Sequence, residues 1–245
     1  MENKPTWKSN IEEILRKAVN YWAMTLNIQI LFSLLYFSII FLLGFYFFKY
    51  YGLLPEFMRL MKLSETDIPA AQKGILEWAK VPDFASFVIA MVVIKAVMFP
   101  LNIGLFQIYR NIDEKLPYSI SDLYAGYRGF NFFKFLGFGI FWGFINLYAH
   151  VSVGLVFIWI LITVFSAPLM YFMNISIFES IRLTVKAYKI DFFTIFSCCV
   201  LAFIFSYFGL IFFLLGIFFT FPFWNAVIYA MYQKYFNEIK KEVLV

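Results

Sequence analysis

The sequence predicts an all-α integral membrane protein in which six transmembrane helices form three units, each with an interfacial helix followed by two spans. Composition is the first observation: the 245 residues are 63% hydrophobic and 14% charged, with a mean hydropathy of +0.80. Soluble domains are about half apolar and about a quarter charged. The second observation is a series of membrane-length apolar segments. The third is a short phrase that recurs three times ahead of such segments.

Six apolar segments have the length that a membrane span requires, which is about 20 helical residues. They are residues 28–48, 84–109, 131–149, 152–173, 191–209 and 212–233. The third and fourth segments nearly touch, as do the fifth and sixth, so each pair is expected to form a tight helical hairpin. No small-residue cleavage site follows the first segment, which is therefore expected to remain as a membrane anchor. The whole chain, 1–245, is interpreted as a single membrane domain.

The basic residues predict the orientation of these spans. Lysines and arginines precede span one, lie between spans two and three and between spans four and five, and follow span six, whereas the two tight turns contain neither. Cytoplasmic segments of membrane proteins carry such an excess. Both termini are therefore predicted to be cytoplasmic, in a multi-pass protein of a bacterial inner membrane. The net charge of +5 follows from this pattern and does not indicate nucleic-acid binding.

Segment 49–83 is predicted to be an extracytoplasmic insertion between the first and second spans. It carries basic residues, but an equal number of acidic residues balances them, and the other segments consistently favour this topology. The phrases "PEFMRLMKL" and "PAAQKGILEWA" within it are typical of short amphipathic helices that start at a proline. Their apolar side chains form a candidate partner surface, with simple packing against the protein's own spans as the alternative. These residues are Phe57, Leu60, Met61, Leu76 and Trp78.

The recurring phrase is a serine followed three residues later by an acid. A serine at this position can accept a hydrogen bond from an exposed backbone N–H of a helix, and the acid can reach back to the serine N–H. The three pairs are Ser9 with Glu12, Ser119 with Asp122, and Ser176 with Glu179. After the first and third pairs, apolar residues fall on one helical face and charged residues on the other. Segments 10–22 and 176–189 are thus predicted to be helices on the cytoplasmic membrane surface.

A proline in the second span of each pair supports the three-unit plan. Pro100, Pro168 and Pro222 occur in "FPLNIGLFQIY", "APLMYFMNISIF" and "FPFWNAVIYAMY". A proline inside a helix frees the carbonyl four residues earlier and bends the helix. Nearby hydroxyl groups are expected to satisfy the freed carbonyls, because membrane helices cannot leave them to water. The hydroxyl groups in question belong to Thr163, Ser166 and Thr220.

The order of amphipathic helix, span and proline-broken span, entered by Ser-x-x-acid, resembles a broad group of uncharacterised bacterial six-span proteins. That group includes the membrane domain fused to some glycerophosphodiester phosphodiesterases. The third unit, from Ser176 to Phe236, carries most of the resemblance. The phosphodiesterase catalytic domain itself is missing, so the resemblance implies a membrane module and no enzymatic activity.

The sequence contains no pattern typical of catalysis or metal binding. His150 is the one histidine, in the turn between spans three and four, and a single histidine without nearby acids makes a poor metal site. Cys198 and Cys199 are adjacent in an apolar segment, which is typical of apolar filling. No cofactor is expected. The acids of the predicted cytoplasmic side are spaced like solvated helix faces and caps: Asp113, Glu114, Asp122, Glu179, Asp191 and Glu238.

Lys95 lies near the middle of span two, where a charge costs about 3 kcal/mol on insertion scales. We expect it to face the interior of the helix bundle and to contact embedded amides, which defines a candidate intramembrane polar site. The alternative is that span two shifts and Lys95 reaches an interface. The candidate amides belong to Asn102, Asn146, Asn174 and Asn225.

Two functions remain open at this point. The favoured one is a non-enzymatic accessory or scaffold subunit of an inner-membrane complex, for example one of protein insertion, export or envelope assembly. Its partners would be membrane lipids and other integral membrane proteins. The alternative is a carrier or flippase for a lipid or another hydrophobic small molecule, since repeats and broken helices are common in transporters.

Overall fold

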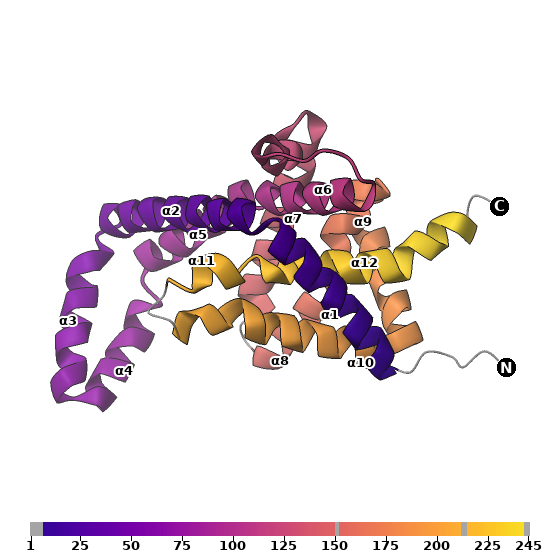
Figure 1. Cartoon of the computed structure of the whole chain (residues 1–245). Helices are drawn as coiled ribbons and strands as arrows, with labels where there is room; N and C mark the ends of the chain where they lie inside the picture. The colour runs from indigo at the N-terminus through magenta and orange to yellow at the C-terminus, as the bar shows by residue number, and fades with distance from the viewer. Residues whose placement is uncertain (1–6, 150–151, 212–214, 243–245) are drawn as a thin grey trace.

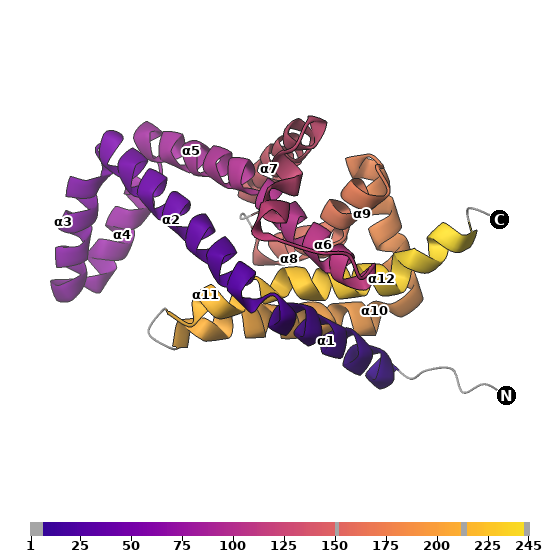
Figure 2. The same cartoon turned by 45° about the horizontal axis from the view of Figure 1, so that its top comes forward.

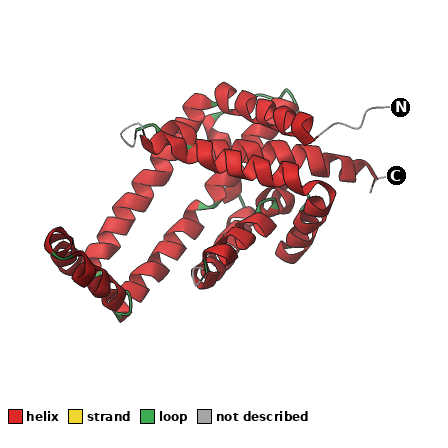
Figure 3. Ribbon diagram, turned by 90° about the horizontal axis from the view of Figure 1, so that it is seen from below, coloured by secondary structure: helices red, strands yellow, loops and turns green. Residues whose placement is uncertain are grey.

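The computed structural model describes residues 7–149, 152–211 and 215–242, and every described segment is a helix or a loop (Figures 1 and 3). Within these residues, five helices are long and apolar enough to cross a membrane: Leu26–Tyr50, Pro82–Asp113, Phe130–Ala149, Gly154–Phe172 and Ile177–Ile211. These candidate spans indicate an integral multi-pass membrane protein. They coincide with the first five spans predicted from the sequence, within a few residues at most ends.

The helices follow one another in a simple order. Before the first proline break they are α1 (Trp7–Met24), α2 (Leu26–Tyr50), α3 (Leu53–Thr66), α4 (Ile68–Trp78) and α5 (Pro82–Met98). The middle of the chain forms α6 (Pro100–Asp113), the 3-10 helix η1 (Ile120–Tyr127), α7 (Phe130–Ala149), α8 (Val153–Thr163) and α9 (Ser166–Phe172). The remainder forms α10 (Ile177–Phe208), the short 3-10 helix η2 (Gly209–Ile211), α11 (Ile217–Thr220) and α12 (Phe223–Glu242).

The predicted sixth span differs from the other five. Residues 212–214 lie outside the described part of the chain, and the rest of the segment forms α11 and the first half of α12. This region is not among the five candidate spans. The break at Pro222 divides it, and the second half of α12 carries charged residues from Lys234 onward. Neither piece is therefore a long uninterrupted apolar helix.

Each predicted proline break is present. Helix α5 ends at Met98 and α6 begins at Pro100, while α11 ends before Pro222 and α12 begins after it. Between α8 and α9 the break falls a few residues before Pro168. The expected hydroxyl partners act differently, however. Thr163 donates to the Trp159 carbonyl at 2.7 Å and Thr220 to the Ser206 carbonyl at 2.9 Å, so neither satisfies the carbonyl that its proline frees.

Two of the three predicted serine caps are present. Ser119 and Asp122 form a complete capping box at η1, and the Ser176 hydroxyl accepts from the Glu179 N–H at 3.3 Å. Ser9 is not a cap, because α1 already includes Trp7 and places Ser9 inside the helix. The predicted helices 10–22 and 176–189 are helical. The first ends at Thr25, between α1 and α2, and the second ends at a kink in α10.

The kink in α10 is centred on Asp191, whose backbone angles of φ −149° and ψ 69° are not helical. The Asp191 carboxylate accepts a hydrogen bond from the Thr194 N–H at 3.3 Å, which caps the second half of the helix. The same carboxylate accepts from the Asn10 amide at 3.2 Å and from the Tyr235 hydroxyl at 3.1 Å. One side chain thus fixes the bend and ties it to α1 and α12.

Helix α12 is the centre of the core. Its residues from Ala226 to Met231 are almost fully buried on all sides, and it packs against α1, α6, α9 and α10 (Figure 1). Helix α6 is buried in a similar way. Gly104 of α6 lies so close to the Leu123 backbone of η1 that no side chain fits between them. These contacts place the ends of α1, α6, α9 and α12 around one another.

Helices α2 and α5 form an arm that points away from this core and carries the α3–α4 hairpin at its far end (Figure 2). In the most apolar stretch of α2 only 11% is buried within the protein, against 39% in the most apolar stretch of Ile177–Ile211. Most of the α2 surface is therefore left to lipid or to another protein.

Candidate functional site

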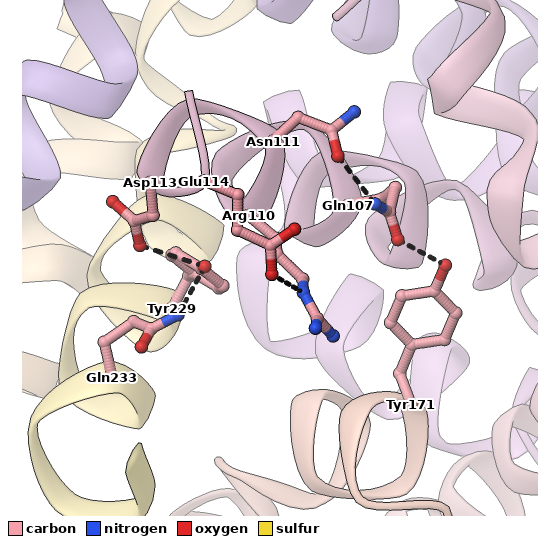
Figure 4. A network of polar contacts seen from close by, with 8 residues as sticks. All are labelled: Gln107, Arg110, Asn111, Asp113, Glu114, Tyr171, Tyr229 and Gln233. Atoms are coloured by element: carbon pink, nitrogen blue, oxygen red, sulfur yellow. Dashed lines mark hydrogen bonds and ion pairs between the residues drawn. The ribbon is translucent and has the colours of Figure 1, made fainter. Parts of the chain in front are cut away.

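The C-terminal end of α6 holds a cluster of polar side chains centred on Asp113 (Figure 4). The two oxygens of its carboxylate accept from two tyrosines: Oδ1 from the Tyr21 hydroxyl at 2.7 Å and Oδ2 from the Tyr229 hydroxyl at 3.1 Å. The Gln233 amide in turn donates to the Tyr229 oxygen. Asp113 thereby joins α1, α6 and α12 at one point, and both of its oxygens are held in place.

The tyrosines around Asp113 are fixed by their mutual packing. The rings of Tyr21 and Tyr109 stack with centroids 5.4 Å apart, and Tyr229 lies 5.4 Å from Tyr21 and 5.6 Å from Tyr109. All three side chains are buried. Burial, with the hydrogen bond to Asp113 added, raises the pKa of Tyr21 well above its ordinary value. The Tyr21 hydroxyl therefore keeps its proton and remains a donor at physiological pH.

Arg110 lies one helical turn before Asp113. Its Nε donates to Oε1 of Glu114 at 2.6 Å, and its guanidinium lies 5.1 Å from the centre of the Phe172 ring, at the end of α9. Stacking on an aromatic face and a carboxylate partner together orient the guanidinium. Within the described part of the chain, its two terminal nitrogens make no hydrogen bond.

A second chain of hydrogen bonds runs along the neighbouring face of α6. The Tyr171 hydroxyl donates to Oε1 of Gln107 at 2.7 Å, and the Gln107 amide donates to Oδ1 of Asn111 at 2.8 Å (Figure 4). These contacts attach α9 to α6 beside Arg110. These hydrogen bonds therefore help to fix the positions of Phe172 and Arg110, in addition to the contact between those two side chains.

A cavity of about 430 Å³ opens between α1, α6, α9 and α12. Its walls combine both signs of charge, since Lys17 and Arg110 are cationic and Asp113 and Glu114 are anionic. The remaining wall is mostly aromatic and includes Tyr21, Phe172 and Tyr232. We call this space the mixed-charge cavity.

The predicted intramembrane polar site is only partly assembled. Asn225 donates its Nδ2 to Oδ1 of Asn102 at 3.1 Å, so these two amides do meet. They line a smaller cavity of about 140 Å³, whose walls include residues from all three proline-associated breaks. Asn146 is half-buried on α7 and does not line this cavity. Asn174 is exposed after α9, where its Oδ1 accepts from Lys134 at 2.9 Å.

Lys95 does not face the interior, and the expectation that it does was wrong. Its side chain is exposed on α5. The face of α5 that includes Val92 and Ala96 packs on α7, where Ala96 lies against Gly139 and Val92 against Gly143 with almost no space between them. This close packing of small residues determines the rotation of α5 and turns Lys95 outward.

The predicted partner surface on α3 and α4 is also divided. Leu60 is buried, because it packs over Gly74 inside the hairpin, and so it is not part of any surface. Trp78 is half-buried against the Phe48 and Phe84 rings, at 6.1 and 5.2 Å. The three remaining side chains are exposed, at 40% for Phe57, 52% for Met61 and 66% for Leu76.

The described residues contain no group of three or more His, Cys, Asp or Glu side chains arranged to hold a metal. His150 lies outside them. Cys198 and Cys199 are free and buried. The mixed-charge cavity brings four charged side chains and three aromatic side chains together at one place.

The sequence assigned Asp113 and Glu114 to solvated faces and caps, and both residues are exposed, but it did not indicate the cavity that they border. One signal was available. Polar residues continue at helical spacing beyond the apolar part of span two, at Gln107, Arg110, Asn111 and Glu114. What the spacing could not reveal is that Tyr21 and Tyr229, distant in sequence, meet Asp113.

Comparison of the chain with protein-family models, with curated proteins and with solved structures finds no match. The resemblance to the six-span group therefore remains a prediction.

Proposed function

We propose that this protein is a non-enzymatic accessory subunit of a bacterial inner-membrane complex and binds another integral membrane protein through the α3–α4 hairpin. A complex of protein insertion, export or envelope assembly is the kind that such a subunit would serve. The single observation that carries the proposal is the hairpin itself: a folded element with exposed apolar side chains, held at the end of the α2–α5 arm (Figure 2).

The hairpin is closed by its own contacts, which leaves its outer face free. Leu60 and Gly74 pack within it, and Phe57 and Trp78 touch Phe48 of α2. Several other large apolar side chains of the hairpin are exposed by roughly half or more. They are Met58, Met61, Ile68, Ile75 and Leu76. An apolar patch on a hairpin that ends two candidate spans suits a partner anchored in the same membrane.

The proposed topology has six crossings, three interfacial-helix units and both termini in the cytoplasm. Contacts at Asp191 support it. Asn10 and Tyr235, near the two described ends of the chain, both donate to this carboxylate. A chain whose ends lie on one face of the membrane crosses it an even number of times. With five candidate spans, α11 and the first half of α12 would supply the sixth crossing. A reporter fused after Val245 should then read as cytoplasmic, and one inserted at Asp67 as extracytoplasmic.

The partner proposal is tested with Met61→Glu combined with Leu76→Glu, in the full chain expressed in a bacterial membrane. Both side chains are exposed, so the protein should fold and express normally. A photo-crosslinking residue placed at Met58 should capture a membrane protein when the rest of the chain is unaltered. The same residue should capture none when the two glutamates are also present. The matched control is Leu116→Glu, at a side chain of 50% exposure outside the hairpin. Unchanged capture by the double variant would contradict the proposal.

A second candidate function is a carrier for a lipid or another hydrophobic molecule. The observation that favours it is the small cavity at the Asn102–Asn225 pair, where residues of the three helix breaks converge. Broken helices that meet in mid-membrane form substrate sites in many transporters. This candidate predicts that Asn102→Leu combined with Asn225→Leu abolishes lipid exchange in reconstituted vesicles while crosslinking at Met58 is unaffected. The accessory role predicts no lipid exchange in the unaltered protein.

A further inference from the structure

We propose that the mixed-charge cavity binds a phosphoethanolamine group, that is, a phosphate and a primary ammonium joined by a short linker. The cavity lies on α1, α6, α9 and α12 and shares no residue with the hairpin, so this inference does not rest on the accessory role. It follows from the N–H donors of Arg110 and the acceptor positions of Asp113 that no described residue uses.

The phosphate half of the ligand is indicated by Arg110. Its Nε is used by Glu114, and its terminal nitrogens have no hydrogen-bond partner among the described residues. The guanidinium is already oriented by the Phe172 ring, so little freedom is lost when it binds an anion. Guanidinium groups bind phosphate oxygens in a bidentate manner. Lys17 adds a second positive charge at the cavity wall, shared with Glu13 at 3.1 Å.

The ammonium half is indicated by Asp113. Its carboxylate accepts two tyrosine hydroxyl groups but forms no ion pair with any described residue. Two oxygens offer about four lone-pair positions, so two remain after the tyrosines are counted. A primary ammonium carries three N–H donors and can use them, whereas a quaternary ammonium cannot. Hydroxyl groups hold the negative charge in place without neutralising it, which leaves it for a cationic ligand.

The position of the cavity favours a lipid as the source of this group. Arg110 and Asp113 lie at the end of the candidate span Pro82–Asp113, and Phe172 ends the candidate span Gly154–Phe172. The ends of spans lie at the level of lipid headgroups. Helix α1, which forms another wall, carries an apolar face and a charged face. The volume of about 430 Å³ falls within the usual range of small-molecule sites.

The first experiment uses the unaltered full chain in detergent and measures the melting temperature with four additives: phosphatidylethanolamine, phosphatidylglycerol, O-phosphoethanolamine and a free amino acid. Phosphatidylethanolamine should raise the melting temperature and phosphatidylglycerol, which has no ammonium, should not. Free O-phosphoethanolamine distinguishes the sources. Stabilisation by it at similar concentration would support the same chemistry with a soluble ligand, whereas stabilisation by the lipid alone would identify a membrane lipid. Equal effects of the two lipids, or stabilisation by a free amino acid in preference to O-phosphoethanolamine, would overturn the proposal.

The second experiment counts bound lipid by native mass spectrometry in charge-removing variants. Arg110→Gln and Asp113→Asn should each lower phosphatidylethanolamine affinity by about tenfold or more, as expected for losing one charge-assisted contact. The matched controls are Arg59→Gln and Glu56→Gln, which break an exposed Arg–Glu pair on α3 and should leave the affinity unchanged. Undiminished affinity in folded Arg110→Gln and Asp113→Asn proteins would contradict the assignment. Should those variants misfold, the melting-temperature series on the unaltered chain decides alone.

Discussion

Asn225 donates its side-chain Nδ2 to Oδ1 of Asn102 at 3.1 Å, and this hydrogen bond joins two helices that each begin at a proline break. Asn102 lies shortly after Pro100, and Asn225 lies shortly after Pro222. The Asn102 Nδ2 also donates to the Phe99 carbonyl at 2.9 Å, within the break itself. The pair therefore links the ends of two interrupted helices where backbone groups need partners.

This link should be measurable as a coupling between the two asparagines. Asn102→Ala and Asn225→Ala should each lower the free energy of unfolding by about 1–3 kcal/mol, because each removes the partner of the other amide, which is buried in Asn225 and half-buried in Asn102. The double variant should lose about 1 kcal/mol less than the sum of the two single losses. Denaturant titration in detergent measures all three, and exposed Gln72→Ala is the control. Strict additivity would show that the bond contributes nothing.

Gly104→Ala should weaken the contact between α6 and η1. A Cβ at this position would overlap the Leu123 backbone, which cannot move aside as a flexible side chain could. We expect the free energy of unfolding to fall by about 1–3 kcal/mol, the usual effect of overpacking. Gly137→Ala on α7 is the matched control, since a Cβ there has no neighbour within 4 Å, and it should be neutral or stabilising. Equal effects of the two substitutions would contradict the close approach.

Asp191→Ala should loosen the bend in α10, because it removes the cap of the second helical segment and the acceptor for Asn10 and Tyr235. A lost cap alone costs about 1 kcal/mol. Asp191→Asn keeps one acceptor oxygen, which can serve either the Thr194 N–H or the pair of Asn10 and Tyr235, and should lose less stability than Asp191→Ala. Thermal unfolding of the two variants tests this difference. Equal losses in Asp191→Asn and Asp191→Ala would mean that charge, and not hydrogen bonding, holds the bend.

The Glu13–Lys234 ion pair should make stability depend on acid. The hydrogen bond from Lys234, followed by the contact with Lys17, lowers the pKa of Glu13 below its usual 4.5. A lowered carboxyl pKa contributes stability above about pH 4.5, and this contribution is lost as the pH falls below that value. Glu13 is partly exposed, so the effect is small. Between about pH 5 and pH 3, Lys234→Met should lose less stability than the unaltered protein. An identical acid dependence would exclude the pair as a contributor.

The sequence was a good guide to features that depend on neighbouring residues. Apolar length located five candidate spans, prolines located the helix breaks, and Ser-x-x-acid located the caps at Ser119 and Ser176. Ser9 had the same pattern but lies inside α1, because helix formation extends past it to Trp7. Local patterns permit a cap without requiring that the helix begin there.

Features that depend on the rotation and packing of distant helices were not predictable in this way. The outward position of Lys95 follows from the close packing of α5 on Gly139 and Gly143 of α7. Asp113 accepts hydrogen bonds from tyrosines on α1 and α12, and the spacing of residues in the sequence identifies neither tyrosine as its partner. The Asn102–Asn225 contact was within reach, since both amides were recognised as embedded, but sequence could not separate this pair from Asn146 and Asn174.

The central position of α12 has a consequence for how the protein is made. During translation the ribosome completes α1, α6, α9 and α10 before it reaches α12, the helix against which all four pack. Until that last helix emerges, Tyr21 and Asp113 lack Tyr229, and Glu13 lacks Lys234. The core of the nascent chain therefore remains incomplete until α12 has been synthesised. Truncation before Phe223 should yield a protein that inserts into the membrane but is rapidly degraded, whereas truncation after Phe236 should remain stable, and pulse-chase labelling distinguishes the two.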